Sequence, residues 1–292
     1  MKIALDPWMI RDRSLTEVCR FVADLGYHWI ELSPRDDFLP LCVPPQATRE
    51  HIAELKRALA NFNVGLASMW TVYHWSDPRN RKEQKAAVGY WKEAIQIAVE
   101  LGCNHLNSEF SGDPGATAES EAAFIHSMEE IVPMLDREKI TMAIEPHPGD
   151  FVEGGNRAVD LIRQVGSSYL KYLYCVPHTF HMGGNMMEMI QYASPLLDQV
   201  HVADTFDHRQ PVRYIVNPPD STVRVHQHLN IGEGEIDWDT CFRSLAQIDF
   251  DGILTNSVFA WPDRAEESAR LMFQKINDYL AKFISQKEVT AR

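Results

Sequence analysis

Short apolar segments alternate with longer amphipathic segments along the whole chain. Eight short segments are rich in apolar residues over four to six positions, and turn or polar residues flank them, which is typical of buried strands. They cover residues 3–6, 29–32, 64–69, 105–109, 141–145, 173–176, 200–203 and 253–258. The pattern therefore predicts eight strands.

Between these segments, apolar residues recur every three or four positions, which predicts amphipathic helices. In the first such segment they are Leu15, Val18, Cys19, Val22 and Leu25. Further helical patterns lie within residues 52–62, 88–101, 124–135, 158–165, 186–192, 238–248 and 268–283. The alternation of strand and helix favours a single (β/α)8 TIM barrel over an open sheet.

No linker rich in Gly, Ser or Pro divides the 292 residues, so we expect one barrel domain over residues 1–292. No Gly-x-Gly-x-x-Gly follows the first strand, so the usual dinucleotide-binding signature is absent. The one long stretch without periodicity, residues 205–235, follows the seventh strand. A loop of that length in a compact domain is usually functional or disordered, and we interpret it as a lid or a substrate-binding loop.

The composition is that of a globular protein with a sizeable core, with 45% hydrophobic and 24% charged residues. No apolar run is long enough to cross a membrane, and the first residues lack the apolar core of a signal peptide. The cysteines are odd in number and form no Cys-x-x-Cys pair: Cys19, Cys42, Cys103, Cys175 and Cys241. Such cysteines are typical of reduced thiols, so we expect a cytoplasmic protein.

The formal net charge of −13 comes from 41 acidic and 28 basic residues. This balance argues against nucleic acid and anionic membranes as partners, because binding to phosphate backbones depends on basic patches. A small molecule is the expected partner. Apolar residues on the helix faces allow a homo-oligomer, but the sequence does not decide this.

Carboxylates and imidazoles occur where successive predicted strands end. Glu109 and Glu145 end the fourth and fifth strands, His178 follows the sixth, and His201 lies in the seventh. In a TIM barrel the carboxyl ends of the strands form the active site. Carboxylate and imidazole together suit a divalent metal such as Mn, Zn, Co, Fe or Mg, which polarises a carbonyl or hydroxyl group.

Four segments carry a resemblance to a known family. They are Ile144-Glu145-Pro146, residues 178–182 (HTFHM), residues 201–204 (HVAD) and residues 232–238 (GEGEIDW). In these segments the chain resembles the xylose-isomerase-like TIM-barrel superfamily of sugar and sugar-phosphate isomerases and epimerases. Residues 31–38 and 201–209 are most similar to its inositol-catabolism branch, the IolH-like proteins.

The resemblance implies a metal held by a Glu on strand 5, an Asp after strand 6, a His on strand 7 and a Glu on strand 8. Glu145 and His201 match the first and third of these ligands, and His181 matches a His that contacts substrate. His178 stands where the family has Asp. The strand-8 Glu is missing, with Asn256 or Ser257 in its place.

These departures change the expected chemistry. The set Glu145, His178 and His201 supplies one negative charge instead of three, which shifts the preference from Mg toward Zn, Fe, Mn or Co. Loss of the second carboxylate removes the obvious partner for a two-base proton transfer. Glu145 is then the candidate base, either alone or with Glu109 from strand 4.

Further residues are candidates for substrate binding. They are His181, Arg209, Glu233, Trp70 and Asn256. Arg209 can hold a carboxylate or phosphate in a bidentate contact, and Trp70 can form an apolar wall for a polyol ring. Structural roles are the alternative for each, such as helix capping, surface ion pairs or core packing. His226 and His228 in the long loop are solvated residues or parts of the lid.

The resulting hypothesis is a metal-dependent isomerase or epimerase that acts on a small keto-polyol, sugar or sugar phosphate in inositol or carbohydrate catabolism. A dehydratase or decarboxylase acting on a related keto-polyol stays open. So does a degenerate barrel that binds sugar without turnover. A hydrolase of the abasic-endonuclease kind is disfavoured, because the chain is acidic and has no basic runs.

Overall fold

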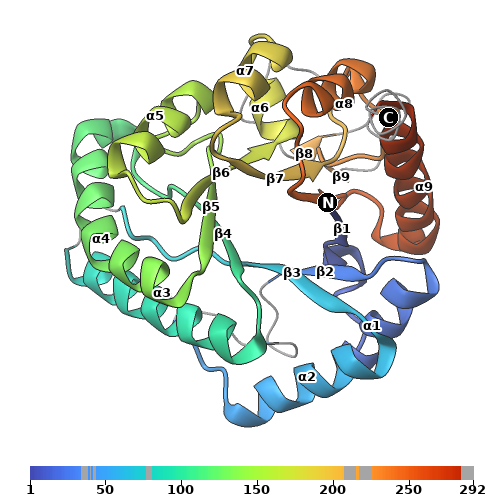
Figure 1. The fold of residues 1–292 in the computed structure, drawn as a ribbon, viewed down its shortest axis with the longest axis horizontal. Helices are drawn as coiled ribbons and strands as arrows, with labels where there is room; N and C mark the ends of the chain where they lie inside the picture. The colour runs from blue at the N-terminus through green and yellow to red at the C-terminus, as the bar shows by residue number, and fades with distance from the viewer. Residues whose placement is uncertain are drawn as a thin grey trace, which may run out of the picture.

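Eight parallel strands close into a barrel in the computed structural model, which describes residues 1–33, 39, 41, 44–76, 81–206, 215–216 and 225–283. Their order around the barrel is β1-β10-β7-β6-β5-β4-β3-β2, and Figure 1 looks along the barrel. The strands are β1 (Lys2–Leu5), β2 (Trp29–Leu32), β3 (Gly65–Trp70), β4 (His105–Glu109), β5 (Thr141–Glu145), β6 (Leu170–Cys175), β7 (Leu197–Val202) and β10 (Ile253–Asn256). The predicted (β/α)8 fold is confirmed.

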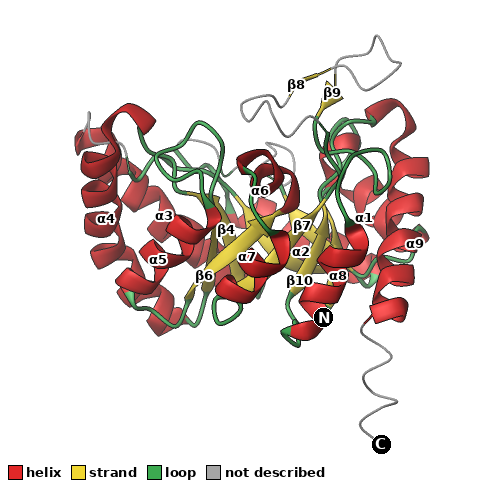
Figure 2. Cartoon of the chain, turned by 90° about the horizontal axis from the view of Figure 1, so that it is seen from above, coloured by secondary structure: helices red, strands yellow, loops and turns green. Residues whose placement is uncertain are grey.

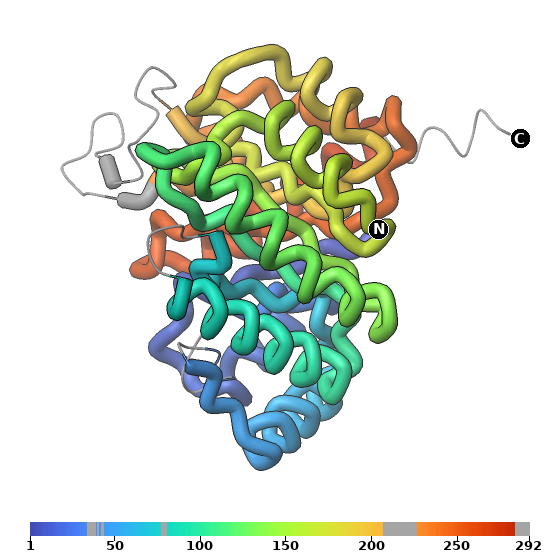
Figure 3. Tube along the Cα trace, turned by 90° about the vertical axis from the view of Figure 1, so that its left-hand side faces the viewer, coloured from blue at the N-terminus to red at the C-terminus, as the bar shows by residue number. Residues whose placement is uncertain are grey.

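Helices surround the barrel, and α2, α3 and α4 follow one another around its outside (Figure 3). The helices are α1 (Leu15–Asp24), α2 (Arg49–Phe62), α3 (Arg81–Leu101), α4 (Thr117–Glu138), α5 (Gly155–Val165), α6 (Val176–Met182), α7 (Met186–Ala193), α8 (Trp238–Gln247) and α9 (Ala265–Phe283). Local sequence sets several of their ends. Ser14 and Glu17 form a reciprocal capping box at the start of α1, and Gly166 ends α5 in the left-handed conformation.

The predicted strand bounds differ most at β6 and β7. Both strands begin three residues earlier than predicted, because Lys171 and Asp198 interrupt the apolar pattern at strand ends that are not fully buried. Helix α6 then starts at Val176, directly after β6, and was not predicted. As a result His178 and His181 lie three positions apart on a helix.

The long loop after β7 contains a short antiparallel hairpin, β8 (Ile215–Val216) with β9 (Val225–His226). Figure 2 shows this hairpin projecting from one end of the barrel. Residues 207–214 and 217–224 lie outside the described residues, so the predicted lid stays a prediction. The loop returns to the barrel at Leu229, whose backbone pairs with that of Asp204 at 2.8 and 2.9 Å.

A layer of polar side chains crosses the barrel interior, and all of them are fully buried: Glu31, Ser68, Asn107, Gln199 and Thr255. Glu31 and Gln199 belong to β2 and β7, which are not neighbours in the sheet, so their hydrogen bond runs through the interior. TIM barrels usually fill such layers with branched apolar residues. In this protein the carboxylate of Glu31 lies at the centre of the layer.

Among the described residues, no helix combines the length and the apolar character needed to cross a bilayer.

Candidate active site

The side chains that follow the polar layer line the barrel mouth. Along a strand, residues two positions apart point to the same face. Two positions beyond members of the polar layer, toward the carboxyl ends of the strands, stand Trp70, Glu109, His201 and Ser257. Glu145 and Cys175 end the two intervening strands. Alternation along the strands therefore gathers carboxylate, imidazole and thiol groups at one end of the barrel.

Glu145 lies between two imidazoles. Its Oε2 atom is 3.4 Å from Nδ1 of His201 and 3.7 Å from Nδ1 of His178. None of these three side chains is more than 7% exposed. Within the described part of the chain, Glu145 Oε2 has no aligned hydrogen-bond donor. The structure thus brings together the three residues predicted as metal ligands and leaves a buried carboxylate oxygen for a further contact.

Glu31, in the polar layer inside the barrel, contacts His201. His201 Nε2 lies 2.9 Å from Glu31 Oε1, and Glu31 Oε2 accepts hydrogen bonds from the Ser68 hydroxyl at 2.6 Å and the Asn107 amide at 2.5 Å. Burial alone would lower the pKa of His201, but the Glu31 charge and the side-chain hydrogen bonds together raise it well above its ordinary value. Burial raises the pKa of Glu31, and the charge of His201 together with the hydrogen bonds to Glu31 outweighs this and lowers it. The two form a buried ion pair.

Glu109 is the second carboxylate at the mouth. It is paired in register with Glu145 on the neighbouring strand, and its Oε1 lies 3.7 Å from Nε2 of His147. Burial, with the charges of Glu145 and Asp150, raises its pKa to about 8. Glu109 therefore holds a proton at neutral pH while its side chain keeps 21% exposure. A carboxyl group tuned in this way suits general acid–base chemistry.

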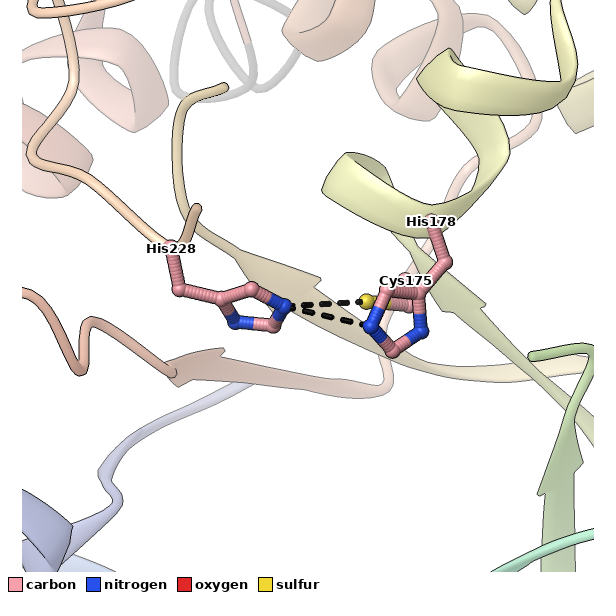
Figure 4. A group of neighbouring side chains, drawn as sticks. All are labelled: Cys175, His178 and His228. Atoms are coloured by element: carbon pink, nitrogen blue, oxygen red, sulfur yellow. Dashed lines mark hydrogen bonds between the residues drawn. The ribbon is translucent and has the colours of Figure 1, made fainter. Parts of the chain in front are cut away.

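His228 joins the cluster from the loop that follows β9. Its Nε2 lies 3.3 Å from Nε2 of His178 and 4.0 Å from Sγ of Cys175, as Figure 4 shows. It is only 2% exposed, and its ring stacks on Phe259. From the sequence, His228 is either a solvated residue or part of the lid, because this loop has no periodic pattern that places its residues.

The donors form two compact groups that share Cys175. One is Cys175, His178 and His228, and the other is Glu145, Cys175 and His201. Burial, followed by the charge of Glu145, raises the pKa of the Cys175 thiol to about 12, so the sulfur carries its proton at neutral pH. Imidazoles with one carboxylate suit Zn, Co, Fe or Mn. The buried donor sets therefore fit a divalent cation of this kind.

Trp70 lies at the mouth, as predicted. Its ring meets that of His201 edge-on, with 6.0 Å between centroids and an interplanar angle of 63°. Trp75, another aromatic near a strand end, is fully buried and stacks on Trp91 in the core. Of Trp70 and Trp75, Trp70 is therefore the one that borders the cluster.

Three predicted substrate residues have contacts elsewhere. Nε2 of His181 lies 3.1 Å from the Thr205 hydroxyl. Glu233 accepts from the Trp261 indole at 2.6 Å. The Asn256 amide donates to the Tyr27 hydroxyl at 3.1 Å.

Strand alternation explains the case of Asn256. Thr255 faces the interior, so Asn256 faces outward and Ser257 faces the mouth. The contacts of Asn256 and Glu233 within the described residues lie outside the Glu145 cluster. Arg209 lies outside the described residues.

A cavity of about 1100 Å³ lies beside α5, α6 and α7. Thr179, Met186 and Arg157 are among its lining residues, and none of Glu145, His178 and His201 is. It is a groove beside the barrel helices.

A closed parallel barrel with carboxylates and imidazoles at its strand ends defines a class of TIM-barrel proteins. The profile of the xylose isomerase-like TIM barrel family matches residues 19–275. The chain therefore belongs to this family, and the predicted resemblance is confirmed.

Individual relatives are distant. Hydroxypyruvate isomerase of Escherichia coli (strain K12) is 25% identical over 166 residues, which cover 54% of this chain and 57% of the relative. The chain thus spans little more than half of that relative. L-ribulose-5-phosphate 3-epimerase UlaE of Salmonella paratyphi A is 21% identical over 260 residues, or 87% of this chain and 84% of the epimerase.

Among solved structures, the IOLI protein with a bound zinc atom superposes with a TM-score of 0.80 at 17% identity. The match covers 98% of this chain and all of the IOLI chain. At this identity the likeness shows a shared fold.

Proposed function

We propose that this protein is a divalent-metal-dependent enzyme of the isomerase or epimerase type. Its substrate would be a small keto-polyol, sugar or sugar phosphate, with a role in inositol or carbohydrate catabolism. The carrying observation is the buried carboxylate of Glu145, placed between two imidazoles and beside a second carboxyl group, Glu109. Family membership and the isomerase and epimerase relatives support the same reaction class.

The cation would be bound within this cluster, and the family resemblance assigns it to Glu145, His178 and His201. When bound, it supplies Lewis acidity that polarises a carbonyl or hydroxyl oxygen of the substrate. The donors carry one negative charge, which favours Zn, Mn, Co or Fe over Mg.

Glu145 and Glu109 carry out different proton transfers. Glu145 is the base that removes a proton from the carbon next to the carbonyl and returns it to the neighbouring carbon. Glu109, which is protonated at neutral pH, donates its proton to the carbonyl oxygen as that oxygen gains negative charge. It then takes a proton from the hydroxyl oxygen on the adjacent carbon, which becomes the new carbonyl. The Glu31–His201 ion pair holds the cluster in place, and Trp70 forms its apolar border.

A barrel that binds sugar without turnover is the second candidate. It is favoured by Ser257, which stands at the strand-8 position where the resemblance implies a catalytic carboxylate. Measured turnover separates the two candidates.

Exchange of solvent deuterium into substrate tests the proposal. The chelated protein is reloaded with Mn, Zn, Co or Fe and incubated in deuterium oxide with a panel of keto-polyols, ketoses and their phosphates. We expect exchange at the carbon next to the carbonyl, detected by proton NMR.

The E145Q variant should lose both exchange and tight metal binding. Glu129, exposed on α4, provides the matched control E129Q, which should behave as the wild type. Full exchange in E145Q, or activity that survives chelation, would contradict the proposal. Sugar binding without exchange would identify the second candidate.

A further inference from the structure

The orientation of His228 is set by its surroundings. Its Nδ1 lies 2.8 Å from the backbone carbonyl oxygen of Ser257. A carbonyl oxygen only accepts hydrogen bonds, so Nδ1 carries the proton and donates it. In a neutral imidazole the other nitrogen, Nε2, then presents a lone pair. Stacking on Phe259 holds the ring so that this lone pair points into the cluster.

The lone pair of His228 meets His178. The two Nε2 atoms are 3.3 Å apart, and Nδ1 of His178 lies 3.7 Å from Glu145 Oε2. A proton on Nδ1 of His178 suits the Glu145 carboxylate but leaves two Nε2 lone pairs facing each other. A proton on Nε2 instead turns a lone pair toward the carboxylate. A cation bound between the two Nε2 atoms accepts both lone pairs and leaves the Nδ1 proton facing Glu145. A second proton on His178 is the alternative.

The spacing favours a metal ion. Two imidazole nitrogens bound to one tetrahedral ion at about 2.05 Å lie about 3.3 Å apart, which matches the observed separation. Hydrogen bonds donated by N–H groups are usually shorter than about 3.2 Å. A thiolate and an imidazole on one such ion lie about 3.6 Å apart, less than the 4.0 Å between Cys175 Sγ and His228 Nε2. The two imidazoles are therefore the ligand pair, and the thiol is a neighbour.

We infer that a divalent transition-metal ion binds between His178 and His228 through their Nε2 atoms. The inference rests on the proposed function and refines its ligand set. His228 supplies the donor that the missing strand-8 carboxylate would provide, because Ser257 at that position orients His228 through its carbonyl oxygen.

Glu145 then acts on the metal through His178. Its Oε2 lies 3.7 Å from Nδ1 of His178, the ring nitrogen from which carboxylates commonly orient metal-bound histidines. The carbonyl of Ser257 has the same function for His228. Glu145 keeps an oxygen for the proton transfer.

Titration of the chelated protein with Co²⁺ tests the inference. Ligand-field absorption reports the coordination, and competition with a chelator gives the affinity. The H228A variant should lose more affinity than the roughly 10–100-fold that follows loss of an outer-shell partner. The H228N variant keeps a donor for the Ser257 carbonyl and should lose affinity equally, which separates ligand loss from misfolding. The control is H126A, on the exposed face of α4, which should bind as the wild type, and C175A tests whether the thiol is a ligand.

The outcomes separate the inference from the proposed function. Wild-type affinity in H228A and H228N overturns the inference, and so does loss of binding in C175A alone. If chelation then still abolishes deuterium exchange, the proposed function stands and the ion belongs to the group of Glu145, Cys175 and His201. If the wild type binds no Co²⁺, a proton bridges His178 and His228 and the inference fails. Exchange that survives chelation refutes the proposed function itself.

Discussion

Asp204 stabilises the chain segment that carries His228 back to the barrel. It is fully buried at the end of β7. Its Oδ1 accepts from the backbone N–H of Thr205 at 2.8 Å and of Ile236 at 3.2 Å. Its Oδ2 accepts from the backbone N–H of Gly232 at 2.7 Å and from the Trp238 indole at 2.9 Å. One carboxylate therefore satisfies four donors from two segments.

The variant D204N tests how much this carboxylate contributes. An amide has one oxygen, so two of the four donors must face an NH₂ group that cannot accept. Each buried donor left without a partner costs about 1–3 kcal/mol. Burial raises the pKa of Asp204, so removal of its charge offsets part of the loss. We expect a net destabilisation of about 3 kcal/mol, which lowers the melting temperature by roughly 6–12 °C in a domain of this size.

Urea unfolding followed by tryptophan fluorescence measures the free energy of unfolding. Hydrogen exchange at Gly232 and Ile236 gives a local readout, since one of these two N–H groups loses its acceptor. Asp278 on the exposed face of α9 provides the matched control D278N, expected within about 0.5 kcal/mol of the wild type. A D204N variant as stable as D278N would refute the reasoning.

Two further predictions concern the carboxylates at the mouth. E31Q removes the negative charge that pairs with His201, so we expect the affinity for Co²⁺ to fall about 10–100-fold. Chelator competition measures this affinity, and an unchanged value would contradict the role of Glu31. The pKa of Glu109 is raised from 4.5 to about 8, so the folded protein holds a proton that the unfolded chain releases, and stability falls as pH rises through this window. In metal-free protein the unfolding free energy of E109Q should therefore fall less between pH 5 and 8 than that of the wild type, and parallel urea-denaturation profiles would exclude the raised pKa.

The predictions that succeeded rest on local periodicity. Every barrel strand was found because apolar runs mark buried strands, and the errors at β6 and β7 arose where Lys171 and Asp198 interrupt those runs. The placing of Glu145, His178 and His201 together followed from one geometric rule, since parallel strands in a barrel end at the same face. The three lie within contact distance through Glu145.

The residues that were missed depend on contacts across the barrel. Glu31 was not among the predicted site residues, yet it lies at the centre of the polar layer because β2 faces β7 through the interior. Asn256 was preferred over Ser257, and only the inward direction of Thr255 shows that Asn256 faces Tyr27.

The sequence by itself determined the barrel, the family and the strand ends where carboxylates and imidazoles gather, because these depend on periodicity and short motifs along one chain. The tertiary structure alone decided which donors meet. His228 lies 50 positions from His178, in a loop without a repeating pattern, and backbone pairing between Asp204 and Leu229 brings it to the cluster. Chain closure of this kind depends on hydrogen bonds between distant segments, and no local pattern encodes them.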